Sequence, residues 1–373
     1  MAHELATQTD GRIAMAYREG DAAPWHALET CPQVVPAAAP IETWADAAGL
    51  NYEVACRPNH RADGTPIADS FYIERTDTGH VTGPYIAGQW QPVQNSAILS
   101  LADRIRDRYH YDIVTAGALF GGASAWVQLE AGLQAEIGPG DEITSRPLFT
   151  VRHTGREANT FAAVQTRVVC NNTLTAALGE ADADIFRHDH RVPLNVEAVE
   201  TVLGLNAQAF GAFAEQARRM AARALSDVEA LEYFKAVMGG RETVEDDGRV
   251  RHSQGVRKAL AYYSGRDFVP VGKDADAELA AYVSDRIDAI ARGARVDLPA
   301  DAVVPADVNP GHALPSAANT LWGAFNTVTW LADQRPVKNR GTGHAIASHL
   351  FGDGTGGALK AKAAREAERL LAA

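Results

Sequence analysis

Hydrophobic and polar positions divide the chain into a strand-rich first half and a helix-rich second half. Apolar and polar residues alternate in "NYEVACRP" and "DSFYIERTD", and the turn-rich "NHRADGTP" lies between them, which predicts two strands joined by a turn. The stretch "HVTGPYIAGQWQPVQN" is also strand-like and is closed by Pro92. Four more strands are expected in succession, with "LFGGAS" as a hairpin turn: "YDIVTAGALFGG", "ASAWVQLEAGL", "DEITSRPLFTVRHTG" and "NTFAAVQTRVVC".

Helical spacing of apolar residues predicts the helices. In "PIETWADAAGL", Thr43 is a plausible N-cap and Gly49 a plausible stop. In "NSAILSLADRIRDRYH", the residues Ile98, Leu101 and Ile105 share one face. Further helices are expected almost throughout residues 196–238 and in "DAELAAYVSDRIDAIARGA", "SAANTLWGAFNTVTWLADQ" and "GGALKAKAAREAERLLAA".

This order of elements predicts an α+β fold, with a mostly antiparallel sheet and packed helices in the N-terminal half and a mainly helical C-terminal half. The expected domain organisation runs as follows: an irregular N-terminal arm at 1–40, an α+β core domain at 41–195, a helical segment at 196–240, a variable insert and linker at 241–315, and a C-terminal helical segment at 316–373.

Composition limits where the protein works. No apolar run approaches the roughly 18 residues of a membrane span. The opening "MAHELATQTDGRIAMAYREG" lacks the apolar core of a secretory signal, so we expect a cytoplasmic protein without a membrane partner. Cys31, Cys56 and Cys170 form no CxxC pair, which argues against a disulfide framework or a cysteine-rich zinc site.

The net charge of −12 opposes nucleic-acid binding by bulk attraction, because like charges repel. Two windows run against this average. Residues 248–266, "GRVRHSQGVRKALAYYSGR", carry five Arg/Lys and no carboxylate, and residues 334–352, "QRPVKNRGTGHAIASHLFG", carry three Arg/Lys and no carboxylate. The charge therefore lowers the expectation of nucleic-acid binding without removing it.

Motifs along the chain resemble a family of phage- and plasmid-associated proteins known only as a domain of unknown function. The matching pieces occur in order: "MAHEL", "APWHAL", "ADAAGLNYEV", "GQWQPVQN", "TAGALFGGASAWV", "RVVCNNTL", "LWGAFNTVT" and "HLFGDGTGGALKAKA". The chain departs from the family in "ALETCP" and "RHTGRE" and is longer over about 242–315. The resemblance implies a mobile-element context and no particular chemistry.

A second resemblance concerns the order of elements. A strand, an aromatic-Gln-Asn corner, a helix, several antiparallel strands and another helix are similar to the core of single-strand annealing proteins of phage recombination. That resemblance implies binding of single-stranded DNA along a basic groove and assembly into an oligomer.

Basic residues beside aromatic ones are the candidate nucleic-acid contacts, because cations neutralise phosphates and aromatic rings stack on bases. If the strands before and after "RHTGRE" form a hairpin, Arg152 and Arg167 approach on one face. The alternative is a solvated face with scattered ion pairs. The full set of candidates is Arg152, His153, Arg156, Arg167, Arg249, Arg251, Arg257, Lys258, Tyr262, Tyr263, Lys338 and Arg340.

Catalytic and metal chemistry are weaker hypotheses. Cys170 in "RVVCNNTL" lacks a cysteine-protease signature and fits a buried residue at a strand end, followed by an Asn or Thr that caps a helix. His188 and His190 in "RHDHR" share a face if extended, but no third ligand is specified. We therefore predict no catalytic residue, no metal and no cofactor.

Three functions remain open at this point. The first is a non-enzymatic mobile-element protein that binds single-stranded nucleic acid, as an oligomer, in annealing, recombination or replication. The second is an interaction protein or inhibitor that acts on a host factor, which the acidic net charge favours. The third is an enzyme that uses Cys170 or the histidine pair.

Overall fold

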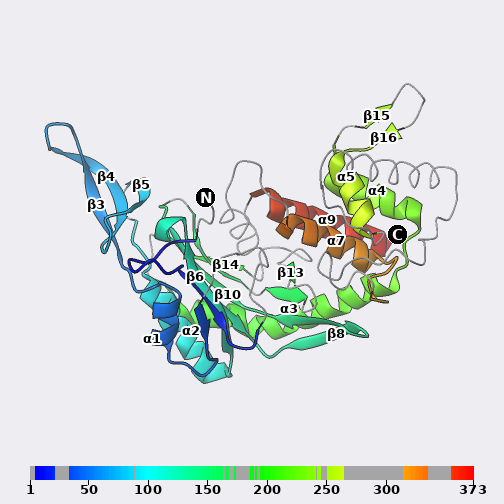
Figure 1. Cartoon of the computed structure of the whole chain (residues 1–373), viewed down its shortest axis with the longest axis horizontal. Coiled ribbons are helices and arrows are strands. Elements are labelled where there is room, and N and C mark those ends of the chain that lie inside the picture. The colour runs from blue at the N-terminus through cyan, green and yellow to red at the C-terminus, as the bar shows by residue number, and fades with distance from the viewer. Residues whose placement is uncertain are drawn as a thin grey trace.

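A computed structural model of the chain describes the residues 5–21, 33–87, 90–155, 157–162, 164–167, 172–173, 185–188, 190, 194–240, 242–244, 250–263, 314–334 and 354–373 (Figure 1). The first strands are β1 (Met15–Arg18), β2 (Gln33–Val35), β3 (Val54–His60), β4 (Pro66–Arg75), β5 (Val81–Ala87), β6 (Asp112–Leu119) and β7 (Ser124–Glu130). They are followed by β8 (Gln134–Gly138), β9 (Asp141–Ser145), β10 (Leu148–Arg152), β11 (Asn159–Ala162), β12 (Gln165–Arg167), β13 (Asn172–Thr173), β14 (Ile185–His188), β15 (Thr243–Val244) and β16 (Val250–Arg251). The helices are α1 (Ile41–Ala47), α2 (Asn95–Tyr109), the short η1 (Phe120–Gly122), α3 (Val196–Ala222), α4 (Asp227–Met238), α5 (Gln254–Tyr263), α7 (Leu321–Gln334) and α9 (Gly354–Ala372).

Seven described strands form the larger sheet, in the order β14–β11–β10–β7–β6–β1–β2. All neighbours in it run antiparallel except β1 and β2, which are parallel. The α+β class is confirmed, and the sheet is mixed rather than purely antiparallel. Two parallel strands need a crossover connection between them. The alternation of apolar and polar residues within each strand does not reveal which strands such a connection pairs.

A second sheet of four strands, β13–β12–β9–β8, explains an error of the sequence analysis. The segments "DEITSRPLFTVRHTG" and "NTFAAVQTRVVC" each predict one strand, but each contains two, which lie in different sheets. The strands β9 and β12 pair in the smaller sheet, whereas β10 and β11 pair in the larger one. Pro147, which has no N–H to donate, lies between β9 and β10.

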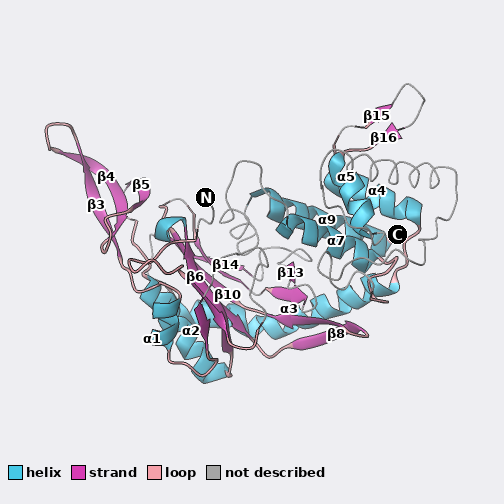
Figure 2. Ribbon diagram, viewed as in Figure 1, coloured by secondary structure: helices cyan, strands magenta, loops and turns pink. Residues whose placement is uncertain are grey.

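The strands β3, β4 and β5 form a separate antiparallel sheet, which we call the wing. The wing projects from the body of the molecule, and the turn between β3 and β4 lies at its far end (Figure 2). Both strands and the turn "NHRADGTP" confirm the prediction from alternation. The wing is followed directly by α2, whose predicted apolar face of Ile98, Leu101 and Ile105 is buried.

Two large hydrophobic cores and a smaller cluster around Trp126 hold the described part of the body together. Helices α1 and α2 pack on the larger sheet around Trp44, whereas α3, α4, α5, α7 and α9 pack together around Trp322 and Phe325. Helix α3 takes part in both, because Val199 near its start lies in the first core and Phe213 lies in the second. A buried polar contact ties the smaller sheet to α7, since Trp322 Nε1 donates to Asp141 Oδ2 over 2.9 Å.

Two local expectations are wrong. Residues 15–18 and 33–35, expected to be irregular, form β1 and β2 of the larger sheet. The strands β1 and β2 are too short to show an alternation of apolar and polar residues. Their pairing with each other, and the pairing of β1 with β6, defines them as strands. Residues 172–173, expected at the start of a helix, form β13, which pairs with β12.

Candidate nucleic-acid interface

The corner "QWQPVQN" connects the wing to α2 through two side chains that bind backbone groups. Gln94 Oε1 accepts from Val54 N at 3.0 Å, and Gln94 Nε2 donates to Val54 O at 2.9 Å, as a neighbouring strand would. Asn95 Nδ2 donates to the carbonyls of Leu50 and Tyr52 at 3.4 and 3.3 Å. These amides fix the segment that enters β3, so the corner positions the wing.

The turn "LFGG" between β6 and β7 supports the base of the wing from the other side. Phe120, Gly121 and Gly122 have φ values of 56°, 65° and 98°, so three consecutive residues lie in the left-handed region. Tyr52 Oη donates to Gly122 O at 2.8 Å, and Arg75 Nη1 donates to Gly121 O at 3.1 Å. The Arg75 guanidinium lies 4.0 Å over the Tyr52 ring, and burial raises the pKa of Tyr52 to about 12.

His153 has a structural role and belongs to the same buried group of hydrogen-bonded side chains at the base of the wing. Its side chain is 1% exposed, and Nε2 lies 3.0 Å from Asn95 Oδ1. Because Asn95 Nδ2 donates to carbonyls, Oδ1 is the acceptor, which assigns the proton of His153 to Nε2. Burial, with smaller contributions from His190 and Arg75, lowers the pKa of His153 to about 3, so the ring is neutral.

The other two histidines of this region are also buried. His190 Nε2 donates to Glu157 O at 2.9 Å, and its ring lies 4.8 Å from that of Trp90. His188 Nδ1 lies 3.2 Å from Asn159 Nδ2, and the two histidine rings are 6.1 Å apart. No group of three His, Cys, Asp or Glu side chains in the described part of the chain has a geometry that could hold a metal ion.

The outer face of α2 carries a polar stripe. Ser96, Ser100, Arg104 and Arg108 follow one another at intervals of four residues, which places them on one side of the helix and exposed. Two hollows border this stripe, of about 350 and about 580 Å³, and Ser100 lines both of them. The stripe thus spans about 18 Å, at about 1.5 Å per residue, alongside two hollows that meet at Ser100.

Aromatic rings continue the stripe at the C-terminal end of α2. The Arg108 guanidinium lies 5.3 Å over the ring of Tyr109, which is 37% exposed. The rings of Tyr109 and Tyr111 are 5.9 Å apart, and burial raises the pKa of Tyr111. Cations interleaved with aromatic rings are the features that bind single strands. The sequence analysis missed this place, although "RIRDRYHY" contains three arginines and two tyrosines.

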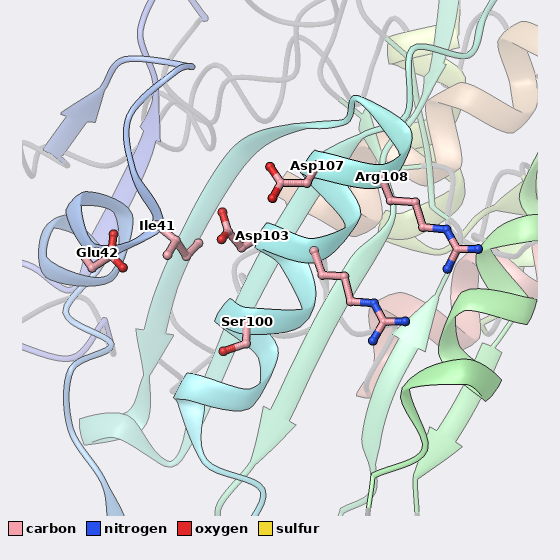
Figure 3. Close-up of a pocket in the computed structure, with 7 residues that line it drawn as sticks. Ile41, Glu42, Ser100, Asp103, Asp107 and Arg108 are labelled. Carbon is pink, nitrogen blue, oxygen red and sulfur yellow. The ribbon is translucent and has the colours of Figure 1, made fainter.

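Carboxylates lie on the other side of α2. Figure 3 shows Glu42, Asp103 and Asp107 directed into the larger hollow beside Ile41, whereas Arg108 extends away from them. Asp103 pairs with Arg106 at 3.5 Å. The carboxylates of α2 thus point toward α1 and its stripe points outward, and residues of both sets, including Arg104 and Arg108, line the larger hollow.

The residues that the sequence analysis placed on one basic sheet face are not brought together. The strands before and after "RHTGRE", β10 and β11, do pair antiparallel, but Arg152 ends β10 in the larger sheet whereas Arg167 ends β12 in the smaller sheet, so the pairing does not bring the two arginines onto one face. Arg152 is 6% exposed and donates to Ser124 Oγ at 3.4 Å. With Arg152 and His153 buried, neither presents its charge or ring to a ligand at the surface of this conformation.

The basic window at 248–266 forms β16 and α5 where the structure describes it. Tyr262 and Tyr263 are 8% and 5% exposed; Tyr262 packs on Trp330, and Tyr263 Oη donates to Thr320 O at 3.3 Å. Arg257 and Lys258 are half-buried on α5. Arg251 lies in β16. Several candidates lie outside the described residues, namely Arg156, Arg249, Lys338, Arg340 and Cys170.

Among the described helices, none has the length and apolarity needed to cross a membrane.

Comparison with known proteins identifies the family to which this chain belongs. Neither the curated proteins nor the solved structures contain a significant match to this chain. Residues 85–350, more than half of the chain and including α2 and most of the described sheets, match the family model described as Domain of unknown function (DUF932). The chain therefore belongs to the DUF932 family.

Proposed function

We propose that this protein binds single-stranded nucleic acid along the outer face of α2. The proposal is carried by one observation: Ser96, Ser100, Arg104 and Arg108 form an exposed stripe along two adjoining hollows, and the Tyr109–Tyr111 pair lies at its end. Hydroxyl and guanidinium groups donate to phosphate oxygens, and a half-exposed tyrosine offers a face to a base.

The spacing of the stripe supports a strand rather than a single anion. Residues four apart on a helix repeat every 6 Å or so, and the four side chains span roughly 18 Å. Such a row can follow several consecutive phosphates of an extended backbone. Arg108 lies in the last turn of the helix, where it also complements the helix dipole, so the effects of its substitution on folding and on binding must be measured separately.

The biological role is proposed from the order of elements. A strand, the aromatic-Gln-Asn corner, α2, several antiparallel strands and another helix follow one another in an order that resembles the core of single-strand annealing proteins. We therefore place this activity in annealing, recombination or replication of a phage- or plasmid-related element in the cytoplasm. The net charge of −12 predicts that binding is confined to such a local track and is sensitive to salt.

The test is the fluorescence anisotropy of a labelled oligothymidine with the full chain at low and moderate salt. The double variant Arg104→Ala/Arg108→Ala should weaken binding by about tenfold or more, since hydrogen bonds to charged groups contribute on the order of 1 kcal/mol or more each. Its dependence on salt should also flatten by about 1.4 in the log–log slope, because each lost single-strand phosphate contact removes about 0.7.

A matched control removes two exposed cations elsewhere. Lys362 and Arg365 lie exposed on α9, so the variant Lys362→Ala/Arg365→Ala makes the same change in net charge. It should bind like the natural chain, and circular dichroism should show both variants folded. Absence of binding by the natural chain at low salt, or equal weakening in both variants, would rule out the α2 interface.

A further inference from the structure

The smaller of the two hollows beside α2 is a slot at the start of the helix. It has a volume of about 350 Å³ and is lined by residues 91–94, by Ser96, Ala97 and Ser100 of α2, and by Leu194. None of these described lining residues carries a charge. The larger hollow differs, because both carboxylates and arginines line it. A neutral slot therefore adjoins a charged hollow, and the two share Ser100.

Four of the side chains that line the slot are apolar. Val93 and Leu194 are half-buried and pack against the core around Trp44. Pro92 and Ala97 complete the apolar lining. A concave site with apolar walls binds a flat uncharged group, because the contact removes apolar surface of both partners from water. The volume of the slot lies near the low end of the roughly 300–1,000 Å³ range of small-molecule sites, so it suits one ring system rather than a large cofactor.

The wall that precedes α2 is fixed at both ends. At its start, Gln91 N donates to His190 O at 2.9 Å. At its end, both atoms of the Gln94 side-chain amide bind the backbone of Val54. Pro92 lies between these points and restricts the backbone further, because its ring fixes φ. This side of the slot is therefore formed before a ligand enters, and binding orders little more of the chain.

The rim of the slot provides neutral hydrogen-bonding groups. Gln91, Ser96 and Ser100 are exposed, and their side chains make no hydrogen bond within the described residues. An amide offers donors and an acceptor, and each hydroxyl offers both. The edges of nucleobases likewise carry donors and acceptors without a formal charge. The rim thus matches the edge of a base, whereas an anion would meet no cation among the lining residues.

The position of the slot relates it to the strand that α2 is proposed to bind. Arg104 follows Ser100 by one helical turn, about 6 Å along the axis, so a phosphate held at Arg104 places a neighbouring nucleotide beside the slot. We infer that the slot, which depends on the proposed function for its ligand, binds one unstacked nucleobase of that strand. A base in a duplex is paired and stacked and enters such a slot only after it flips out. The slot therefore favours single strands.

Fluorescence anisotropy with two labelled strands of equal length tests this inference, one an oligothymidine and the other an abasic strand with the same phosphates. The natural chain should bind the oligothymidine about tenfold more tightly or better. Ala97→Phe fills the slot and should weaken binding of the oligothymidine by about tenfold, the scale of one base contact. Gln91→Ala changes an exposed rim residue and should weaken it by about fivefold, the scale of one hydrogen bond. Both variants should bind the abasic strand like the natural chain.

The control Ala236→Phe makes the same substitution at an exposed position of α4 and should bind both strands like the natural chain. Circular dichroism checks that each variant is folded. Arg104→Ala/Arg108→Ala should instead weaken binding of both strands, which separates the slot from the phosphate contacts. Equal binding of the two strands by the natural chain, or unchanged binding of the oligothymidine by folded Ala97→Phe and Gln91→Ala, overturns the slot and leaves the α2 interface standing. A natural chain that binds neither strand at low salt overturns both.

Discussion

Acidification from pH 7 to pH 5 should destabilise this protein through His153. The ring is 1% exposed and donates from Nε2 to Asn95 Oδ1, and burial lowers the pKa of His153 from 6.5 to about 3. A second proton would charge a ring that no solvent reaches. The folded state therefore holds the imidazole of His153 in its neutral form.

The direction and magnitude of this loss of stability follow from the difference in the pKa of His153 between the folded and unfolded states. Because the folded-state pKa is depressed, the stabilisation is fully present above the unfolded value of 6.5 and is lost as the pH falls from there towards 3. One pKa unit corresponds to about 1.4 kcal/mol, and pH 5 lies about 1.5 units below the ordinary value. The free energy of unfolding should fall by about 2 kcal/mol from this residue alone.

Chemical denaturation at pH 7 and pH 5 measures this loss. The variant His153→Gln keeps an N–H donor for Asn95 but cannot titrate, so its free energy of unfolding should fall by about 2 kcal/mol less than that of the natural chain. The control His60→Gln removes an exposed imidazole of the wing and should show the full loss. Equal losses in His153→Gln and the natural chain would refute the reasoning.

Two further substitutions test the packing that positions the candidate interface. Asn95→Ala removes the donor of two backbone carbonyls and the acceptor of His153 Nε2, so it should lower the free energy of unfolding by about 3 kcal/mol, measured by thermal or urea unfolding. The control Ser96→Ala changes an exposed neighbour and should cost far less. A similar cost in both variants would contradict the role of Asn95 at the base of the wing. Gly323→Ala places a methyl group against the carbonyl of Ala317 in the second core and should sharply lower the yield of folded protein. Expression yield and circular dichroism measure this loss, and a folded variant of natural stability would contradict the expected clash.

Local patterns predicted most of the regular elements correctly. The apolar face of α2 and the alternation of β3 and β4 appear in the structure where the sequence places them. Such patterns depend on residues a few positions apart, which the chain itself presents. The caps were less accurate: α1 begins after Pro40 rather than at Thr43, although Gly49 has the expected positive φ.

Burial of the candidate site residues was harder to predict. Arg152 and His153 carry ionisable groups, yet both are buried. His153 lies where the wing and α2 meet and contacts Thr82 and Asn95, whereas Arg152 donates to Ser124 at the start of β7. For α5 a signal existed: Val256, Leu260 and Tyr263 follow helical spacing and are buried, which predicts that Tyr263 faces a core. Aromatic residues beside cations are therefore informative only once the helical face is known.

The sequence by itself determined the α+β class, the strands of the wing, the long helices and membership of a family described as a domain of unknown function. Only the tertiary structure decided that β9 and β10 belong to different sheets, that β1 and β2 are parallel, and that the carboxylates of α2 point toward α1 while its stripe points outward. The physical reason is range. Periodicity reports on neighbours along the chain, whereas sheet membership, burial and surface grouping depend on contacts between residues far apart in sequence.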